Sequence, residues 1–186
     1  MRILACADMH GHPERVARVR TLVAEHAPDI VLLPGDLTHL DAGADALTLL
    51  HTLPMPVLAV LGNMDGPRSV GEIQQHGKLM GMQPVTISNV TFGGPNVTES
   101  CDVLITHEPP LGTLDVARLG RHIGSRAVLE MVQRLRPRVL TCGHVHESPG
   151  IVRLGDTLVV NCTMGDGKTG GALVELRGET VEARLL

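Results

Sequence analysis

The chain has 186 residues, enough to bury one hydrophobic core and too few for two cores of comparable size. Hydrophobic residues make up 43% and charged residues 19%, which is typical of a globular protein and excludes a disordered one. The net charge of −4 and the single aromatic residue, Phe92, argue against a nucleic-acid polymer as partner, whereas a small phosphate ester is compatible with them.

Targeting and redox features point to the cytoplasm. Met1 leads directly into a strand-like run, without the basic and long apolar regions of a signal peptide. No apolar run approaches the roughly 20 residues that span a bilayer, so we expect no membrane partner. The cysteines are scattered without a C-x-x-C pair, which predicts buried and reduced thiols at Cys6, Cys101, Cys142 and Cys162.

The first third of the chain alternates between predicted strands and predicted helices. Its strand-like segments are almost entirely apolar, which is typical of a parallel sheet covered on both faces. Pro13 marks the start of the first helix. The predicted strands are residues 2–8, 29–36 and 56–63, and the predicted helices are residues 13–26, 44–53 and 69–77.

After residue 77 the pattern becomes richer in short strands. Residues 84–95 predict two antiparallel strands around Asn89, and residues 125–135 predict a helix after a loop rich in Pro and Gly. Further strands are predicted at 101–107, 138–144, 150–156, 157–163, 171–176 and 180–186. We predict a single α/β domain over residues 1–186, in which the later strands form a second sheet packed on the first.

Polar side chains of metal-ligand type follow five of the predicted strands. The loops at the carboxyl ends of parallel strands line the ligand crevice of open α/β sheets, so these side chains are expected to meet. A lone histidine or a single Gly-Asp at such a position is usually structural, but five in succession make coincidence a poor explanation. The strand ends are Asp8-Met9-His10, Gly35-Asp36, Gly62-Asn63, His107 and Gly143-His144-Val145-His146.

The spacing and chemistry of these residues predict a site for two metal ions. In D-x-H and H-x-H, an extended backbone points both side chains to the same side, so each pair can grip one ion. Carboxylate, imidazole and amide ligands without thiolate suit Mn, Fe, Zn or Ni. The seven candidates suffice for two ions that share one bridging carboxylate, and they leave positions open for water and substrate.

The order of these motifs resembles that of the calcineurin-like metallophosphoesterase superfamily. The family order is D-x-H, G-D, G-N-H-D/E, H and G-H-x-H, and the chain has DMH, GD, GNMD, H and GHVH between Asp8 and His146. The stretches GDLTH, GNMD, THEPPLGTLD, RHIGSRAVL and CGHVHES are also similar to a compact prokaryotic branch of phosphoesterases related to the Icc protein.

This resemblance implies a four-layer α-β-β-α sandwich with a dinuclear metal centre at the strand ends. It also implies hydrolysis of a small phosphodiester or phosphomonoester by attack of a metal-bridging hydroxide, with manganese as the expected metal and Fe, Zn or Ni as alternatives. Asp36, Asn63 and Asp65 are the implied catalytic residues. By motif position, Asp8, His10 and His146 would hold one ion, Asp36 would bridge, and Asn63, His107 and His144 would hold the other.

Several polar neighbours are candidates for contact with substrate or ligands. His12, His39 and His122 are predicted to contact substrate together with Asn63, although capping or other structural roles account for their positions equally well. Ser125 is a further candidate for substrate contact, but it precedes a predicted helix and its simplest role is to cap that helix. Asp65 follows a ligand motif directly and is predicted to orient an imidazole.

Met64 is a departure from the family pattern. Many members have histidine there, assigned to stabilising the transition state or protonating the leaving group, and methionine has no proton to donate. Water, His12, His39 or His122 are the alternative donors. An enzyme that acts on substrates with good leaving groups would not need a proton donor.

Two other functions are compatible with the same fold. One is a protein-binding scaffold without catalysis, although such relatives usually have eroded ligands and the low aromatic content offers little for an interface. The other is a nuclease, against which the calculated pI near 6.2 and the missing aromatic residues argue. A homo-oligomer is compatible with the sequence as well.

Overall fold

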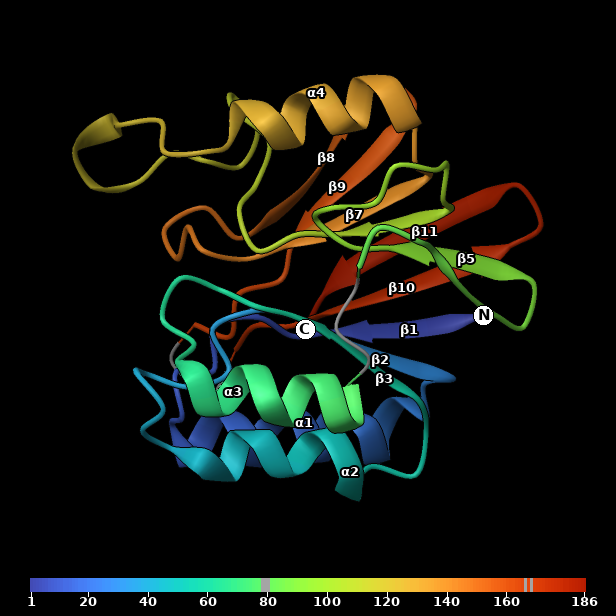
Figure 1. Cartoon of the computed structure of the whole chain (residues 1–186). Helices are drawn as coiled ribbons and strands as arrows, with labels where there is room; N and C mark the ends of the chain where they lie inside the picture. The colour runs from blue at the N-terminus through green and yellow to red at the C-terminus, as the bar shows by residue number, and fades with distance from the viewer. Residues whose placement is uncertain (78–80, 166, 168) are drawn as a thin grey trace.

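The computed structural model describes residues 1–77, 81–165, 167 and 169–186. Two β-sheets pack face to face, with α1, α2 and α3 covering the outer face of one sheet and α4 covering the other (Figure 1). This is the four-layer α-β-β-α arrangement that the sequence predicts. No helix among the described residues is long and apolar enough to cross a membrane.

The first sheet is built on three parallel strands joined by helical crossovers, as the alternating pattern predicts. Its helix α1 coincides with the predicted residues 13–26. The second crossover combines the 3₁₀-turn η1 with the short α-helix α2, and the segment from β3 to the second sheet combines the short helix α3 with the π-turn η2. The elements are β1 (Arg2–Ala5), α1 (Pro13–His26), β2 (Ile30–Pro34), η1 (Ala44–Thr48), α2 (Leu49–Thr52), β3 (Val57–Val60), α3 (Pro67–Glu72) and the π-helix η2 (Ile73–Gly77).

The second sheet has the strand order β4-β5-β6-β7-β9-β8. Its central pairs β5–β6, β6–β7 and β7–β9 are parallel, and the outer pairs are antiparallel hairpins. Ser125 accepts a hydrogen bond from the N–H of Val128 and so caps α4. The elements are β4 (Val85–Ile87), β5 (Val90–Gly93), β6 (Val103–Ile105), η3 (Arg118–Gly120), α4 (Arg126–Leu135), β7 (Val139–Cys142), β8 (Gly150–Leu154) and β9 (Thr157–Asn161).

The assignment of every later strand to the second sheet is wrong for the last two. The strands β10 (Ala172–Arg177) and β11 (Thr180–Leu185) belong to the first sheet, whose order is β11-β10-β1-β2-β3. β10 pairs antiparallel with β1, with Ala5 opposite Ala172. The pairing removes an open edge from β1, which would otherwise expose unpaired N–H and C=O groups.

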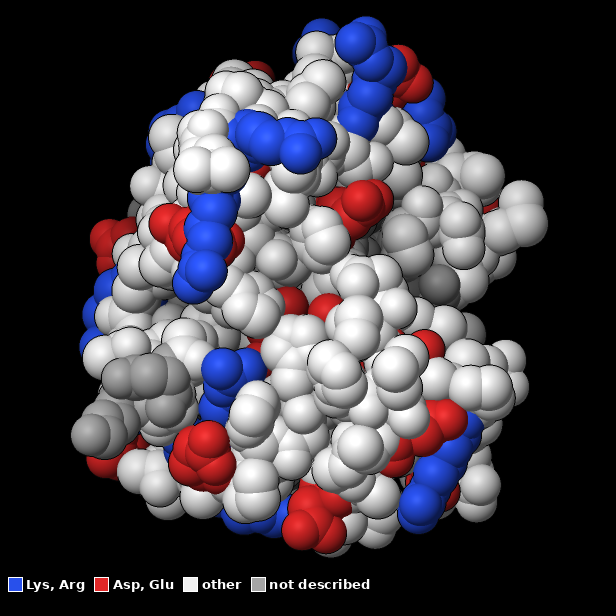
Figure 2. All heavy atoms as spheres, turned by 90° about the vertical axis from the view of Figure 1, so that its left-hand side faces the viewer, with Lys and Arg blue, Asp and Glu red and all other residues white. Residues whose placement is uncertain are grey.

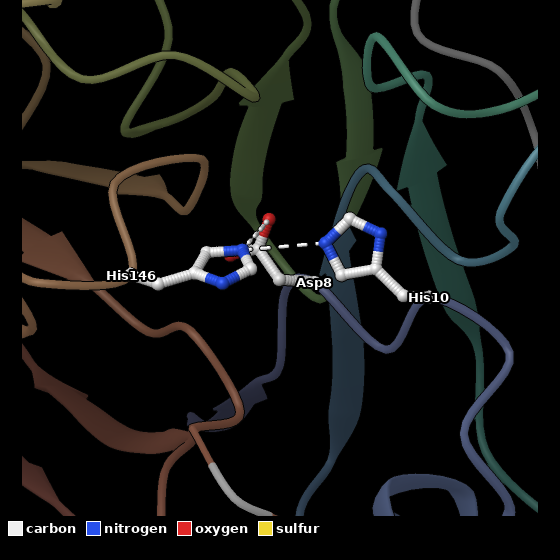
Figure 3. Close-up of side chains that lie close together, drawn as sticks. All are labelled: Asp8, His10 and His146. Carbon is white, nitrogen blue, oxygen red and sulfur yellow. Dashed lines mark hydrogen bonds and ion pairs between the residues drawn. The ribbon is translucent and has the colours of Figure 1, made fainter.

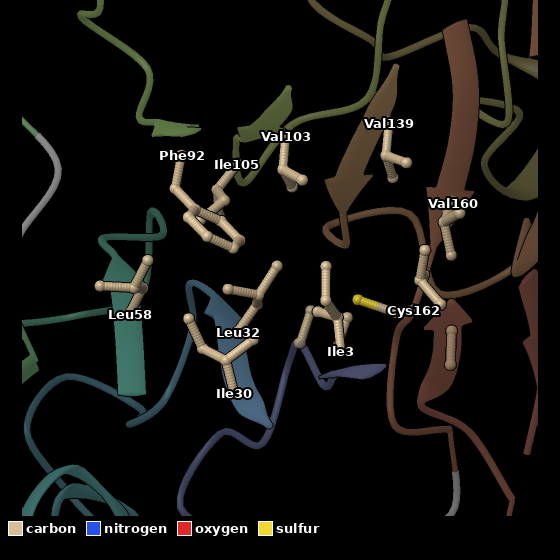
Figure 4. Packing of buried hydrophobic residues seen from close by; sticks show 14 of the residues in the cluster. Ile3, Ile30, Leu32, Leu58, Phe92, Val103, Ile105, Val139, Val160 and Cys162 are labelled. Atoms are coloured by element: carbon tan, nitrogen blue, oxygen red, sulfur yellow. The ribbon is translucent and has the colours of Figure 1, made fainter. Parts of the chain in front are cut away.

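A hydrophobic core fills the space between the two sheets. Alternate residues of the strands face it, so Ile3 lies in this core while Leu4 faces the helices. Figure 4 shows Ile3, Leu32 and Leu58 of the first sheet opposite Phe92 and Val103 of the second. Burial of such side chains stabilises the fold by about 1.5–3 kcal/mol each, which fixes the two sheets against one another.

Several strands end earlier than predicted, and the reason lies in the motif residues themselves. The predicted strand 2–8 ends at Ala5, and the predicted strand 29–36 ends at Pro34. Asp8 has φ +62° and Asp36 has φ +52°, and neither conformation can continue a β-strand. The chain therefore leaves each strand and turns its polar side chain into the crevice.

Candidate metal centre

Asp8, His10 and His146 bring together the two ends of the motif series. Their side chains point toward one another from the loop after β1 and the loop after β7 (Figure 3). The Nε2 atoms of His10 and His146 are 3.3 Å apart, and the Nε2 of His146 lies 3.4 Å from the Oδ1 of Asp8. One ligand atom from each of the three residues lies within 4.8 Å of the others, which is the spacing of a candidate metal site.

A second group of donors lies beside the first. Asp8, Asp36 and His107 also offer ligand atoms within 4.8 Å of one another. The Nε2 of His107 is 3.0 Å from the Oδ1 of Asn63 and 3.2 Å from the Nδ1 of His144. The structure therefore gathers all seven candidate ligands, although they come from five segments of the chain.

Asp36 lies between the two groups. Its Oδ2 atom is 3.7 Å from the Nε2 of His10 and 3.4 Å from the Nε2 of His107. Its Oδ1 atom accepts a hydrogen bond from the N–H of Met64 at 2.7 Å, which fixes the orientation of the carboxylate. A single oxygen thus faces both donor groups, which is the position of a bridging ligand.

The surroundings of His107 show whether the cluster suits a cation. Its Nδ1 lies 2.9 Å from the carbonyl oxygen of Pro34, which can only accept, so Nδ1 carries a proton. If Nε2 of His107 were also protonated, that proton could hydrogen-bond to the Oδ1 of Asn63 or to the Nδ1 of His144, but not to both. A cation would instead attract the lone pairs of His107, Asn63 and His144 at the same time. The donor set of imidazole, amide and carboxylate fits divalent Mn, Fe, Zn or Ni.

Metal binding requires ionised carboxylates and neutral imidazoles, a requirement that the two aspartates and two of the four histidines meet. Burial opposes the ionisation of Asp8 and Asp36, but hydrogen bonds and charges from nearby imidazoles outweigh it and hold the pKa of both carboxyls below the usual range. Burial lowers the pKa of His10 and His144. Burial would also lower the pKa of His107, but its hydrogen bond with Asp36 outweighs this effect and raises it. The hydrogen bond with Asp8 likewise raises the pKa of His146, so these two imidazoles would have to release a proton to a metal ion.

Four of the candidate ligands have a left-handed backbone. The φ angles are +62° at Asp8, +48° at His10, +52° at Asp36 and +68° at His144. This conformation costs a non-glycine residue about 1–2 kcal/mol, and it persists only where the surrounding structure enforces it. Such residues concentrate at functional sites, so the strain supports a functional role for this cluster independently of its side-chain chemistry.

The glycines of the motifs allow ligands from neighbouring strands to approach. A Cβ atom at Gly62 would lie 2.1 Å from the Oδ1 of Asp36, and one at Gly143 would lie 2.4 Å from the Oδ2 of Asp8. Both distances are shorter than any tolerated contact, and in both cases the obstructed atom belongs to a different motif. Each glycine is therefore needed by the ligand of another strand.

The sequence match to known proteins covers the whole cluster. Residues 1–148 match Metallophos, the calcineurin-like phosphoesterases. The chain belongs to this family.

Individual proteins are similar to this chain in sequence or in fold. The uncharacterized protein MJ1162 of Methanocaldococcus jannaschii is 28% identical in an alignment of 195 positions, gaps included, that covers 87% of each chain. A solved archaeal phosphodiesterase superposes over the full length of both chains with a TM-score of 0.66 at 18% identity. Vacuolar protein sorting 29 of Cryptosporidium parvum gives a TM-score of 0.58 at 15% identity and covers 100% of this chain and 96% of its own. These two likenesses show the fold alone.

Asp65 lies next to the cluster of this calcineurin-like phosphoesterase but does not orient an imidazole. Its Oδ1 accepts hydrogen bonds from the backbone N–H and the hydroxyl of Thr38 at 2.9 and 3.2 Å. Its Oδ2 accepts one from the N–H of Gly62 at 3.0 Å. Asp65 therefore ties the loop after β2 to the loop after β3, and so holds Asp36 and Asn63 in register.

The three histidines predicted to contact substrate lie in different settings. The His39 ring is exposed and lies 6.0 Å from the ring of His10. His12 occupies the N-cap position of α1 without capping it through its side chain, and its Nδ1 lies 3.6 Å from Glu14. His122 lies in the long loop between β6 and α4, where its Nδ1 pairs with Asp115 at 2.7 Å. Of the three, His39 is the one with a ring contact to a candidate ligand.

Arg15 is a residue of this site that the sequence interpretation missed. Its guanidinium donates a hydrogen bond of 2.7 Å to the carbonyl oxygen of Asp8. Its positive charge also contributes to lowering the pKa of His10 and opposes the rise at His146. The available signal was its place in the first turn of a helix that follows the D-x-H motif directly, which points this turn back at the site.

A cavity of about 360 Å³ opens beside the second donor group. Its lining includes the candidate ligands Asn63, His107 and His144 together with Pro95 and Val128. Seen from this side, the molecule is hollowed between its upper and lower layers, and acidic atoms are visible inside the hollow (Figure 2). The volume suits a small molecule.

Proposed function

We propose that the chain is a metal-dependent phosphoesterase that hydrolyses a small phosphodiester or phosphomonoester. The observation that carries the proposal is the position of Asp36, whose Oδ2 faces both His10 and His107. Two donor groups that share one carboxylate oxygen are the arrangement required for two neighbouring cations. Membership of the calcineurin-like phosphoesterases supports the same reaction class.

Each residue of the cluster has a definite part in this proposal. Asp8, His10 and His146 would hold one ion, Asn63, His107 and His144 would hold the other, and Asp36 would bridge them. When bound, two divalent ions supply Lewis acidity for the phosphate oxygens and lower the pKa of a water molecule. Manganese is the metal we would test first, with Fe, Zn and Ni as alternatives.

The substrate phosphate would bind between the donor cluster and Arg15. Asn63 is exposed, so its amide is accessible to a phosphate oxygen. Arg15 uses one donor on the carbonyl of Asp8, and the guanidinium has four further N–H donors for a phosphate. The adjoining cavity of about 360 Å³ would take the organic part of a small ester.

The leaving group needs a proton that Met64 cannot supply. The Met64 backbone is part of the site, because its N–H holds Asp36 and its carbonyl accepts a hydrogen bond from the N–H of Leu40. Of the other histidines considered, His39 has a ring near the cluster, whereas His122 is engaged by Asp115. We therefore favour His39 or water as the donor.

The two rival functions make different demands on the site. A protein-binding scaffold would not need strained ligands, yet Asp8, Asp36 and His144 all have left-handed backbones. A nuclease would need a positively charged track, and the net charge of the chain is −4. Neither rival explains why a carboxylate oxygen stands between two groups of imidazoles.

The test is the hydrolysis of bis(4-nitrophenyl) phosphate by the purified protein in the presence and absence of Mn²⁺. Asp36→Asn keeps the shape of the side chain and removes its charge, and we expect it to lower kcat/KM about a thousandfold. Asp45→Asn is the matched control, because Asp45 is exposed on η1. Equal activity of wild type and Asp36→Asn would refute the proposal.

A further inference from the structure

A second cluster of potential ligands lies on the helical layer, away from the strand ends. His51 belongs to α2, Glu72 is the last residue of α3, and His76 lies in η2. One ligand atom from each lies within 4.8 Å of the other two. Figure 1 shows α3 running beside α2 over the outer face of the first sheet, and the helices α2 and η2 are in contact.

The three side chains approach one another from two neighbouring segments, α2 and the consecutive elements α3 and η2. Glu72 and His76 are four residues apart, so they share one helical face, and the Oε2 of Glu72 lies 3.9 Å from the Nε2 of His76. His51 faces them from the neighbouring helix, with its ring 5.0 Å from the ring of His76 and tilted by 52°. π-turns such as η2 are rare and occur often at functional sites.

We propose that His51, Glu72 and His76 form a separate binding site for one Zn²⁺ ion. Two imidazoles and one carboxylate are a ligand set that proteins use for zinc, with the fourth position left to water. Zinc with bonds of about 2.0–2.2 Å requires ligand atoms about 3.3–3.6 Å apart in a tetrahedron. The ligand atoms of the three residues all lie within 4.8 Å of one another, so they would have to move closer by at most about 1.5 Å, which rotation of partly exposed side chains can supply.

The site is open to a metal ion from solvent. His51 and His76 are exposed, and the side chains of Glu72 and His76 are each 33% accessible. An ion at this position would link α2 to the end of the α3–η2 segment. That segment begins at Pro67, soon after Asn63, and its first turn is held by Asp41, which accepts hydrogen bonds from the N–H groups of Arg68 and Ser69.

Zinc binding at this position would stabilise the helical layer. It would not involve the strand-end centre, the cluster formed by Asp8, His10, Asp36, Asn63, His107, His144 and His146. The ordinary alternative is a surface ion pair between Glu72 and His76 with His51 as a bystander. Such an exposed pair contributes little to stability and binds no ion. The two accounts differ in the number of zinc ions that the folded protein holds.

The experiment is a calorimetric titration of the metal-free protein with Zn²⁺, compared among wild type, His51→Ala and Glu72→Gln. We expect each variant to bind one equivalent of zinc fewer than wild type, or to bind this equivalent at least about tenfold more weakly. Loss of a residue that only hydrogen-bonds a metal ligand already lowers metal affinity by about this factor. His26→Ala is the matched control, because His26 lies at the end of α1 and its Nε2 is 4.0 Å from the carboxylate of its neighbour Glu25.

Three further measurements keep this result separate from the proposed function. The same difference of one equivalent should persist when His51→Ala is compared with its parent in an Asp36→Asn background, where the strand-end centre is impaired. Manganese-dependent hydrolysis by His51→Ala should equal that of wild type. Zinc raises the Tm of wild type more than that of His51→Ala if the site exists. Identical stoichiometry and affinity in wild type, His51→Ala and Glu72→Gln would overturn the inference.

Discussion

The strand-end centre and the helix-surface cluster of His51, Glu72 and His76 use the same kinds of ligand but are built differently. At the strand ends, Asp8 and Asp36 are buried and have left-handed backbones. In the helix-surface cluster, His51 and Glu72 lie on regular α-helices and are partly or fully exposed. The first arrangement requires the rest of the fold to hold it, whereas the second requires only two adjacent helices.

This difference shows which features mark a site that the fold is organised around. Left-handed backbone at non-glycine residues and glycines at close contacts lower the stability of the fold. They therefore persist mainly where several segments together form a functional site. A helical surface can bring histidines together at no such cost. We therefore expect the strand-end centre to control activity and the helix-surface cluster to affect only zinc binding and stability.

The largest contrast between the two regions is expected from a pair of glycine substitutions, one in each region. In Gly62→Ala, the new Cβ would lie 2.1 Å from the Oδ1 of Asp36, so the carboxylate must move. We expect kcat/KM to fall about a hundredfold, because displacements of about 1 Å at a catalytic site have effects of this size. Steady-state kinetics with bis(4-nitrophenyl) phosphate measures it.

Gly71→Ala is the matched control near the helix-surface cluster. A Cβ at Gly71 would meet nothing within 4 Å, and the residue lies inside α3. We expect unchanged kinetics and a free energy of unfolding higher by about 0.5–1 kcal/mol, since alanine is the better helix former. Comparable losses of activity in both variants would erase the distinction between the two regions.

A smaller effect is expected at Arg15, which supports the strand-end centre from α1. Arg15→Gln removes the charge next to Asp8 and should lower kcat/KM about tenfold, the value of one hydrogen bond to a charged group. Arg15→Lys keeps the charge and should recover part of this loss. Arg20→Gln is the control on the same helix, because Arg20 bonds to the hydroxyl of Thr48. If Arg15→Gln and Arg20→Gln behave alike, Arg15 has no part in the reaction.

The smallest effect is expected at Asp115, a buried carboxylate whose partners are all within its own loop. It accepts hydrogen bonds from the N–H groups of Gly112 and Gly124 and from His122. Asp115→Asn should lower the free energy of unfolding by about 1 kcal/mol, measured by urea denaturation at neutral pH. It should leave metal stoichiometry unchanged, in contrast with ligands of either cluster.

The pH dependence of this effect has a definite sign. Burial opposes ionisation of Asp115, but the hydrogen bond from His122 and those from the backbone outweigh it and lower the pKa below the ordinary value of 3.8. A carboxyl with a lowered pKa stabilises the folded state above its unfolded pKa, and the stabilisation is lost as pH falls through the folded pKa. The difference between wild type and Asp115→Asn should therefore shrink below about pH 4, and a difference that grows there would contradict this role.

The local features of the fold could be predicted from the sequence, and the long-range ones could not. The boundaries of α1 follow from Pro13 and the apolar period, and the position of Asn63 follows from the end of an apolar strand. The sheet to which β10 belongs depends instead on its pairing with β1, more than 160 residues earlier in the chain. Nothing in either segment alone specifies that partner.

The same limit applies to the sites. Motif residues such as Asp36 could be found because each follows a strand, and parallel strands bring such ends together. Arg15 and His51 could not be found this way, since they lie on helices whose rotation relative to the site depends on packing. Asp65 was assigned a neighbouring imidazole because it follows a ligand motif, yet the turn directs it to Thr38.

The pairing of β10 with β1 also bears on the order in which the molecule can be completed during its synthesis. Residues 1–148 contain every candidate ligand, but β1 gains its second neighbour only when residues 172–177 arrive. The backbone groups of Met1 then bond to those of Leu176, which closes the sheet beside the strand that leads to Asp8 and His10. A growing chain thus carries all the candidate ligands before β10 pairs with β1. The final hairpin of β10 and β11 therefore stabilises the strand that leads into the candidate metal centre.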